Sequence, residues 1–175
     1  LREILEQGLE DVAAFGIFDP DAVRQVVNAG IGNAVTVTLG ARFHMDALEQ
    51  QSKPLTITGT VRLISDGKFT ITGPMDTGAR VNMGTTVIVD TGCVEVIIVS
   101  RHVEPYDLGC VTSLGIDPMN KRFLMLKSRI HYRAVFMPIA RSIIECAGCG
   151  VCTSDYDQLT FENVRRPIYP LDNVD

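Results

Sequence analysis

The most constraining feature of this sequence is the regular alternation of apolar and polar residues at 55–64. A period of two is typical of a strand with one buried face. Asp66-Gly67 follows at once, a pair that favours a tight hairpin turn. Further short apolar runs, separated by turn residues, complete the pattern: 69–72, 85–89 and 94–99. We therefore expect residues from about 54 to 100 to form an antiparallel β-rich section.

The segment before this section has the order strand, helix, strand. Residues 12–18 are an apolar run of strand length, and Asp19-Pro20 is a typical helix start. An aspartate accepts hydrogen bonds from the free N–H groups of the first turn, and proline suits the first helical position. Gly30 is a natural end for this helix, and 34–39 has strand character. A β-α-β order predicts a right-handed crossover and a parallel pair of strands.

The last third returns to alternating helices and strands. Asp107 is placed to cap a short helix that ends at Gly115, and 122–127 is predicted to be a buried strand. Residues 134–144 have a helical pattern, which Pro138 shortens or kinks. The predicted fold class is mixed α/β, with parallel β-α-β segments flanking an antiparallel β-rich middle section.

Length, charge and cysteine content limit the classes of function. The 175 residues fit one domain, 1–175. A net charge of −5, with no basic run longer than Arg165-Arg166, argues against nucleic-acid and anionic-membrane partners. No apolar run could span a bilayer, and no signal peptide is visible. Five cysteines, an odd number without clear partners, favour a reduced cytoplasmic setting.

The first residues already have a helical pattern. Leu1, Ile4, Leu5 and Leu9 share one helical face, and neither an N-cap residue nor a methionine precedes them. An uncapped helix favours the interpretation that the chain continues upstream in a larger protein. The alternative is that only a few disordered residues are missing.

The segment with the most chemical potential is 127–133. It follows a predicted apolar strand, and open α/β sheets bind ligands beyond the carboxyl ends of their strands. Lys127 and Arg133 carry positive charge, Ser128 has a hydroxyl, and His131 is titratable. These four residues are our candidate substrate-binding residues, suited to a carboxylate, a phosphate or a carbonyl. The alternative is a solvated basic turn with His131 merely packed.

Evidence for a metal site within the chain is weak. The three histidines, His44, His102 and His131, are far apart, and no His-Glu-x-x-His pattern occurs. Cys146, Cys149 and Cys152 form a Cys-x-x-Cys-x-x-Cys run, which could ligate zinc or an iron–sulfur cluster. The run lacks a fourth ligand, so we favour a glycine-rich loop with incidental cysteines. Nucleotide-binding loops and the G-x-S-x-G elbow of serine hydrolases are absent from the sequence.

An ordered set of segments extends over nearly the whole chain: 15–23, 29–32, 35–40, 61–67, 73–75, 100–107, 114–118, 127–128, 131–134 and 165–172. In sequence and in order, this set resembles the C-terminal domain of the MlrC-like (microcystinase C) family of metallopeptidases. The chain departs from the family pattern at Cys149, where a Pro-Gly loop is commoner.

The resemblance implies part of a zinc-dependent hydrolase that cleaves small peptides. It places the zinc ligands in a larger N-terminal domain outside this chain, and that domain is the expected partner. Lys127, Ser128, His131 and Arg133 would then contact substrate in a shared cleft, and the isolated chain would be inactive. Zinc would polarise a carbonyl and acidify a water, while this domain would supply positive charge near the oxyanion.

Two other interpretations stay open at this point. One is a non-catalytic accessory or oligomerisation domain, with homo-oligomer formation undecided by the sequence. The other is a cysteine-based metal or iron–sulfur module.

Overall fold

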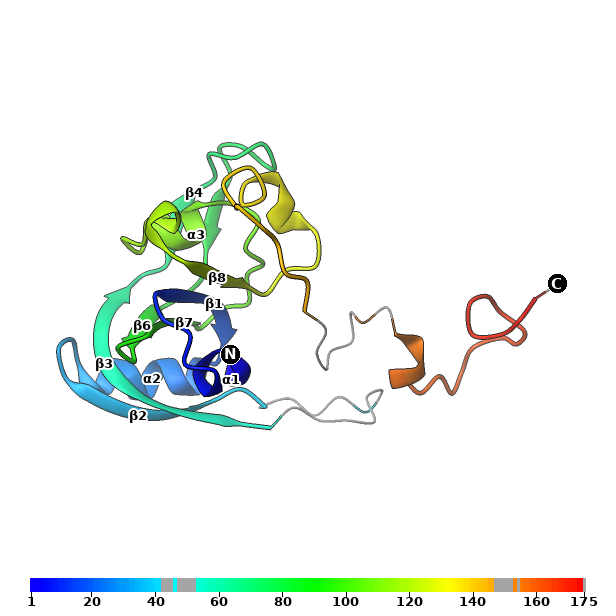
Figure 1. The fold of residues 1–175 in the computed structure, drawn as a ribbon, viewed down its shortest axis with the longest axis horizontal. Helices are drawn as coiled ribbons and strands as arrows, with labels where there is room; N and C mark the ends of the chain where they lie inside the picture. The colour runs from blue at the N-terminus through cyan, green and yellow to red at the C-terminus, as the bar shows by residue number, and fades with distance from the viewer. Residues whose placement is uncertain (42–45, 47–52, 147–152, 154, 175) are drawn as a thin grey trace. The chain divides into compact units, whose positions relative to one another are not determined.

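The computed structural model describes residues 1–41, 46, 53–146, 153 and 155–174 (Figure 1). The chain divides into two compact units, Leu1–Gly40 with Pro54–Ile143 and Ala41–Lys53 with Ile144–Asp175. The expectation of one domain over 1–175 stays a prediction. No helix within the described ranges is long and apolar enough to cross a bilayer.

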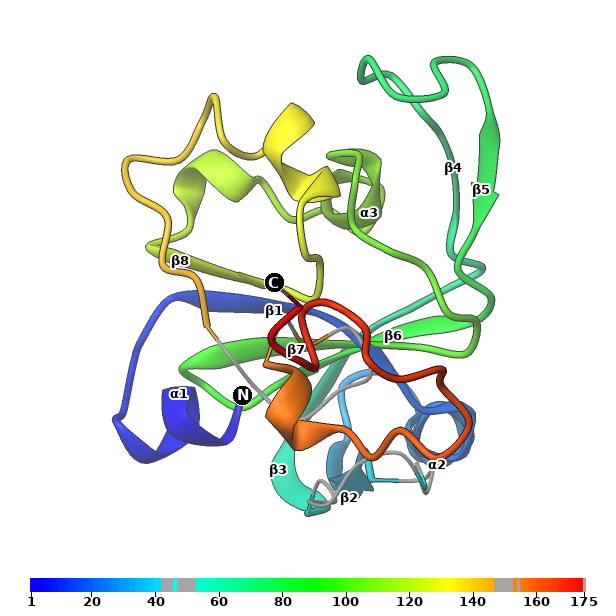
Figure 2. The ribbon, with the colours of Figure 1, turned by 90° about the vertical axis from the view of Figure 1, so that its right-hand side faces the viewer.

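The first unit is built on a six-stranded mixed sheet with the strand order β2-β3-β6-β7-β1-β8 (Figures 1 and 2). A separate two-stranded ribbon pairs β4 with β5. The elements of this unit are α1 (Arg2–Glu6), β1 (Val12–Phe18), α2 (Pro20–Ala29), β2 (Ala34–Leu39), β3 (Leu55–Ser65), β4 (Lys68–Thr70), β5 (Arg80–Asn82), β6 (Thr86–Asp90), β7 (Val94–Val99), α3 (Gly109–Thr112), a 3-10 turn (Pro118–Asn120), β8 (Phe123–Leu126) and a 3-10 turn (His131–Ala134). The mixed α/β class and the antiparallel middle section are confirmed.

The centre of the sheet is buried on both faces. All six residues of β7 are buried, which is typical of a central strand covered on two sides. One face packs on α1 and α2, through residues such as Val23 and Val26. The other face packs on α3 and on the segment after β8, through Val111, Val135 and Phe136. The sheet is therefore the middle layer of three.

The predicted parallel pairing of 12–18 with 34–39 is wrong. β1 lies between β7 and β8 and is parallel to both, while β2 pairs antiparallel with β3. The parallel crossover of this unit is thus β7-α3-β8, with β1 inserted between its strands. Consecutive strands often pair, but β1 cannot pair with β2 because both of its edges are already hydrogen-bonded, to the apolar strands β7 and β8.

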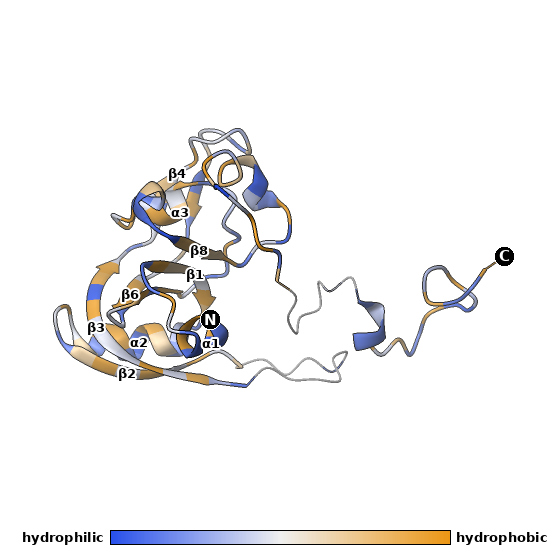
Figure 3. Ribbon diagram, viewed as in Figure 1, coloured by the Kyte–Doolittle hydropathy of each residue, from blue (hydrophilic) through white to orange (hydrophobic). Residues whose placement is uncertain are grey.

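β2 instead lies at the sheet edge, where its alternation matches that of β3. Val37 pairs with Ile57 on the buried face, while the Thr36 and Thr58 hydroxyls hydrogen-bond at 2.9 Å on the exposed face. Thr38 and Thr56 repeat this bond at 2.9 Å. Apolar and polar colours accordingly alternate along β3 in Figure 3.

The predicted hairpin at Asp66-Gly67 is also wrong. β3 pairs with β2 and β6, and β4 pairs with β5, so no ladder joins the strands on either side of this turn. The turn is a corner at which the chain leaves the main sheet. Gly67 has φ +64°, and a Cβ there would meet the Gly84 carbonyl and the Thr86 hydroxyl. The runs 85–89 and 94–99 of the predicted antiparallel section do pair antiparallel, as β6 and β7.

The helix predicted for 134–144 does not form. A single 3-10 turn, His131–Ala134, ends before Pro138. Proline lacks the N–H that would continue the helix and disfavours helical backbone at the residue before it. Val135 and Phe136, buried in the core, fix the chain at this point.

Two buried aspartates hold loops against the sheet. Asp19 accepts hydrogen bonds from the N–H of Ala22, at the start of α2, and from that of Gly40, after β2. Asp107 accepts from the N–H groups of Thr72, Gly73 and Gly109, at 3.2, 2.7 and 2.7 Å. The short helix expected after Asp107 is present as α3.

A charged group is buried where β7 begins. The Glu95 side chain is 5% exposed and forms ion pairs with Arg62 and with Lys121, whose Nζ lies 3.2 Å from Oε2. Lys121 also reaches Asp11 at 3.1 Å. Neither Glu95 oxygen accepts a hydrogen bond of good geometry in the described part of the chain, so the two cations compensate it by charge alone.

The second unit contains a 3-10 turn, Tyr156–Gln158, and a closed loop near the C-terminus. Asp172 accepts hydrogen bonds from the Arg166 side chain and from the Ile168 N–H. The Asp172 N–H in turn donates to the Ile168 carbonyl, at 2.9 Å. Residues 166–172 therefore turn back on themselves and are not extended, although the two prolines of this segment favour extended backbone at the residues before them.

We expect Asp107→Asn to lower the free energy of unfolding by about 1–3 kcal/mol, because an amide NH₂ would face backbone donors that now have a carboxylate acceptor. Urea unfolding followed by circular dichroism measures this loss. Asp117→Asn is the matched control, because Asp117 is exposed and bonds only its own short turn. An equal loss in both variants would contradict the assigned role of Asp107.

Lys121→Met should destabilise the fold by about 1–3 kcal/mol, because it leaves the buried Glu95 with one cation. The same urea titration measures the change. Lys53→Met, at an exposed position, should cost less than about 0.5 kcal/mol. If the two variants unfold alike, Lys121 does not compensate Glu95.

Candidate functional site

The carboxyl ends of the three parallel strands meet at one edge of the sheet. Phe18 pairs with Val99, and the Lys127 N–H donates to the Phe15 carbonyl. Segments 100–104 and 127–131 therefore leave the sheet at the same edge, on either side of β1, where open α/β sheets bind ligands. We call this edge the carboxyl edge.

A carboxylate organises the side chains at this edge. The Ser128 hydroxyl donates to Glu104 Oε1 at 2.5 Å, and His131 Nδ1 lies 2.9 Å from Glu104 Oε2. The Tyr132 N–H donates to the Ser128 hydroxyl at 3.3 Å, and the Arg129 N–H also bonds to Glu104. Glu104 thus joins the segment after β7 to the segment after β8. We refer to Glu104, Ser128 and His131 as the Glu104 cluster.

The contact with Glu104 sets the chemistry of His131. A carboxylate only accepts, so Nδ1 carries the proton in this contact, and Nε2 holds the lone pair of the neutral ring. The His131 side chain is 47% exposed. Its Nε2 can therefore accept a proton or hydrogen bond from a ligand, or donate when the ring is charged.

Burial and hydrogen bonding act in opposite directions on Glu104. Partial burial raises the pKa of its carboxyl, but the donors Ser128 and His131 outweigh burial and lower the pKa below its usual value. Glu104 is therefore ionised at neutral pH. The ionised carboxylate accepts the Nδ1–H of His131 in this contact.

The structure places the four predicted site residues on one exposed segment. Ser128 and His131 come together through Glu104, whereas Lys127 and Arg133 flank them with exposed side chains. The Arg133 guanidinium lies 5.9 Å from the Tyr132 ring centre. Because the Ser128 hydroxyl already bonds Glu104 and Tyr132, its first role here is to hold the turn. Contact of these residues with a substrate stays a prediction.

Sequence reasoning did not single out Glu104 or Arg101. Both follow β7, just as Lys127 follows β8, so the same rule on carboxyl ends would have found them. His102 lies on this segment too, with its ring 6.0 Å from that of Phe18.

The residues described here do not fit a metal ion. Among them, no group of three or more His, Cys, Asp or Glu side chains is arranged to hold one. Cys146 is exposed, whereas Cys149, Cys152 and His44 lie outside the described residues. Burial raises the pKa of Cys110, so this thiol stays protonated at neutral pH.

Glu104→Gln should change the acid sensitivity of the fold. Since the folded-state pKa of Glu104 is lowered from 4.5, its ionised form stabilises the folded state above that pH, and the contribution is lost as pH falls through the folded-state value. The stability difference between wild type and Glu104→Gln should therefore shrink between about pH 5 and pH 3. Urea titrations across this range measure it.

Ser128→Ala tests the cause of this shift. Without the hydroxyl donor, the pH dependence attributed to Glu104 should become smaller. A difference that stays constant with pH would refute the ion-stabilising role of the cluster.

Comparison with known proteins identifies a matching family and two similar proteins. The model of the family described as "MlrC C-terminus" matches residues 1–163. Microcystinase C of Sphingomonas sp. is 25% identical over 174 residues, which is 99% of this chain and 32% of that protein. A crystal structure from Mesorhizobium sp. BNC1, described as that of a candidate metallopeptidase, aligns with a TM-score of 0.84 and 28% identity, over 99% of this chain and 34% of its own.

The chain thus spans about a third of each larger relative. The family match covers nearly all of the elements described above, including both segments of the carboxyl edge. The chain belongs to the MlrC C-terminus family.

Proposed function

We propose that this chain is the C-terminal domain of a metal-dependent hydrolase of small peptides. Its carboxyl edge contributes substrate contacts to a cleft that it shares with the N-terminal domain of the same protein. The family match and the likeness to larger, metallopeptidase-related proteins support this proposal.

The observation that carries the proposal is the Glu104 cluster. A half-exposed histidine is oriented by a carboxylate, and that carboxylate is itself held by a hydroxyl and a backbone N–H. Such an arrangement fixes the orientation of the ring before a ligand arrives. A merely packed surface histidine has no need of two further donors on its partner carboxylate.

In this proposal the metal ion is bound outside the residues described here. Because the described residues do not form a set of metal ligands, we assign the ion, expected to be zinc, to the N-terminal domain. When bound there, it would supply Lewis acidity. The side chains of this domain would bind and orient the peptide substrate.

In its doubly protonated form, His131 would donate a hydrogen bond from Nε2 to the carbonyl oxygen of the bond to be cleaved, or to the oxyanion that forms from it. The hydrogen bond from this doubly protonated ring strengthens as negative charge develops on the substrate oxygen. Lys127 and Arg133, exposed on the same segment, add positive potential for a peptide's acidic groups.

In the full-length protein, His131→Ala should lower kcat for cleavage of a linear peptide by a factor of about 10², the scale of one lost oxyanion donor. Steady-state kinetics on a fluorogenic peptide measure this. Glu104→Gln should give a smaller loss and an altered pH–rate profile, because it changes the environment of His131 without removing the ring.

Arg122→Ala is the control, because Arg122 is an exposed cation at the opposite end of β8. Its kinetics should match wild type. If His131→Ala also matches wild type, the carboxyl edge does not take part in catalysis and the domain is an accessory one.

A further inference from the structure

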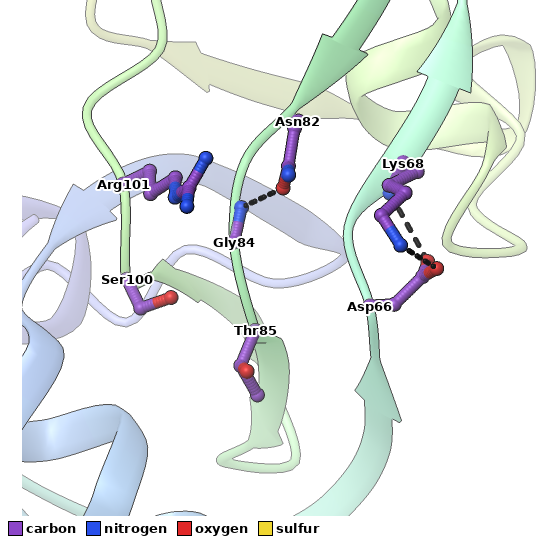
Figure 4. Close-up of a pocket in the computed structure, with 7 residues that line it drawn as sticks. All are labelled: Asp66, Lys68, Asn82, Gly84, Thr85, Ser100 and Arg101. Atoms are coloured by element: carbon purple, nitrogen blue, oxygen red, sulfur yellow. Dashed lines mark hydrogen bonds and ion pairs between the residues drawn. The ribbon is translucent and has the colours of Figure 1, made fainter.

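A second feature of the carboxyl edge is an open pocket of about 370 Å³ (Figure 4). The strand register explains its position. Ser65 pairs with Thr86, and Thr86 pairs with Val99, so the residues just beyond this row lie together. Arg101 and Ser100 form one side of the pocket, the Asp66–Lys68 pair forms the other, and Gly84 lies between them.

The backbone fixes the Arg101 side of the pocket. The Arg101 N–H donates to the Met83 carbonyl at 2.9 Å, and the Ser100 N–H donates to the Thr85 carbonyl at 3.1 Å. Gly84 has φ +69°, and a Cβ there would collide with the Ser100 hydroxyl and the Arg101 side chain. A glycine at this position therefore allows the segments 83–85 and 100–101 to approach each other, and it leaves the pocket open.

The pocket carries one uncompensated positive charge. Lys68 Nζ lies 3.1 Å from Asp66 Oδ2, and the Lys68 N–H donates to Asp66 Oδ1, so these two charges neutralise each other. The Arg101 side chain is exposed, and no residue in the described ranges forms an ion pair with it. A guanidinium offers two parallel N–H groups to a planar oxyanion.

We propose that this pocket binds the terminal carboxylate of a peptide substrate, with the Arg101 guanidinium as its bidentate partner. The Ser100 and Thr85 hydroxyls, which line the same pocket, supply additional donors. This inference rests on the proposed function and specifies the end of the substrate that the domain recognises.

Charge favours a carboxylate over a phosphate. The single net positive charge of the pocket matches a monoanion. A phosphate dianion carries more negative charge than the pocket can neutralise, and it would also lie near the ionised Asp66. The hydrogen bond from the Lys68 side chain lowers the pKa of Asp66.

The spacing along the chain connects this pocket with the Glu104 cluster. Two residues separate Arg101 from Glu104, and three Cα–Cα steps limit the distance between their Cα atoms to about 11 Å. An extended peptide covers roughly 3.3 Å per residue. A carboxylate on Arg101 would therefore bring a bond within a few residues of the C-terminus to His131, which predicts preference for short peptides or for cleavage near the C-terminus.

The test is equilibrium binding of a matched ligand pair to the full-length protein, measured by calorimetry. The ligands are one tripeptide with a free C-terminal carboxylate and its C-terminal amide, both N-methylated at their peptide bonds to prevent cleavage. Wild type should bind the acid at least about tenfold more tightly than the amide. Arg101→Ala should bind the two ligands equally.

Two further variants sharpen the result. Arg101→Lys should keep part of the preference, because it retains the charge but loses the planar fork. Arg80→Ala removes an exposed cation on β5, outside the pocket, and should keep the full preference. Circular dichroism checks that each variant is folded. If Arg101→Ala does not fold, Arg101→Lys replaces it in the test, with a reduced preference for the acid as the expected result.

Equal affinity of wild type for acid and amide, or no measurable binding of the acid, would overturn the proposal. So would a full preference in Arg101→Ala, or displacement of the peptide by inorganic phosphate at lower concentration than by acetate. Binding is measured without turnover, so an inactive protein that still prefers the acid would refute the peptidase proposal and leave the pocket standing.

Discussion

The burial of β1 between β7 and β8 is the constraint on which the rest of the structure depends. Two parallel ladders hold β1, and apolar side chains cover both faces of the central strands. Because all three strands run in one direction, their carboxyl ends reach the same edge of the sheet. Every group that we assign to function, from Arg101 to His131, lies on a segment leaving that edge or on the turns beside it.

Charged side chains have different roles at the amino ends of the parallel strands and at the carboxyl edge. Where β7 and β8 begin, Glu95 is buried and its cations Arg62 and Lys121 are committed to it. At the carboxyl edge, Glu104 is only partly buried, and it orients a histidine whose second nitrogen remains available. Charges that are paired and buried hold a fold together, whereas exposed donors with oriented partners can bind a ligand.

Most strands could be predicted from the sequence, because each has a local signature. The alternation at 55–64 predicted β3, Asp19-Pro20 predicted the start of α2, and the apolar run 94–99 predicted β7. The errors concern partners rather than elements. β2 joins β3 because their threonines and aliphatic side chains match across the ladder, and Asp66-Gly67 forms a corner because its flanking strands pair elsewhere.

The sequence by itself determined the mixed α/β class, the family resemblance and the segment 127–133 as a candidate site. These depend on residue type and spacing within short stretches of chain. Only the tertiary structure decided that Glu104 holds Ser128 and His131, and that Arg101 faces a pocket opposite the Asp66–Lys68 pair. Glu104 and Ser128 are 24 residues apart, and they meet because β7 and β8 are both parallel to β1, so both strands end at the same edge of the sheet. Such contacts are set by strand order, which local patterns do not encode.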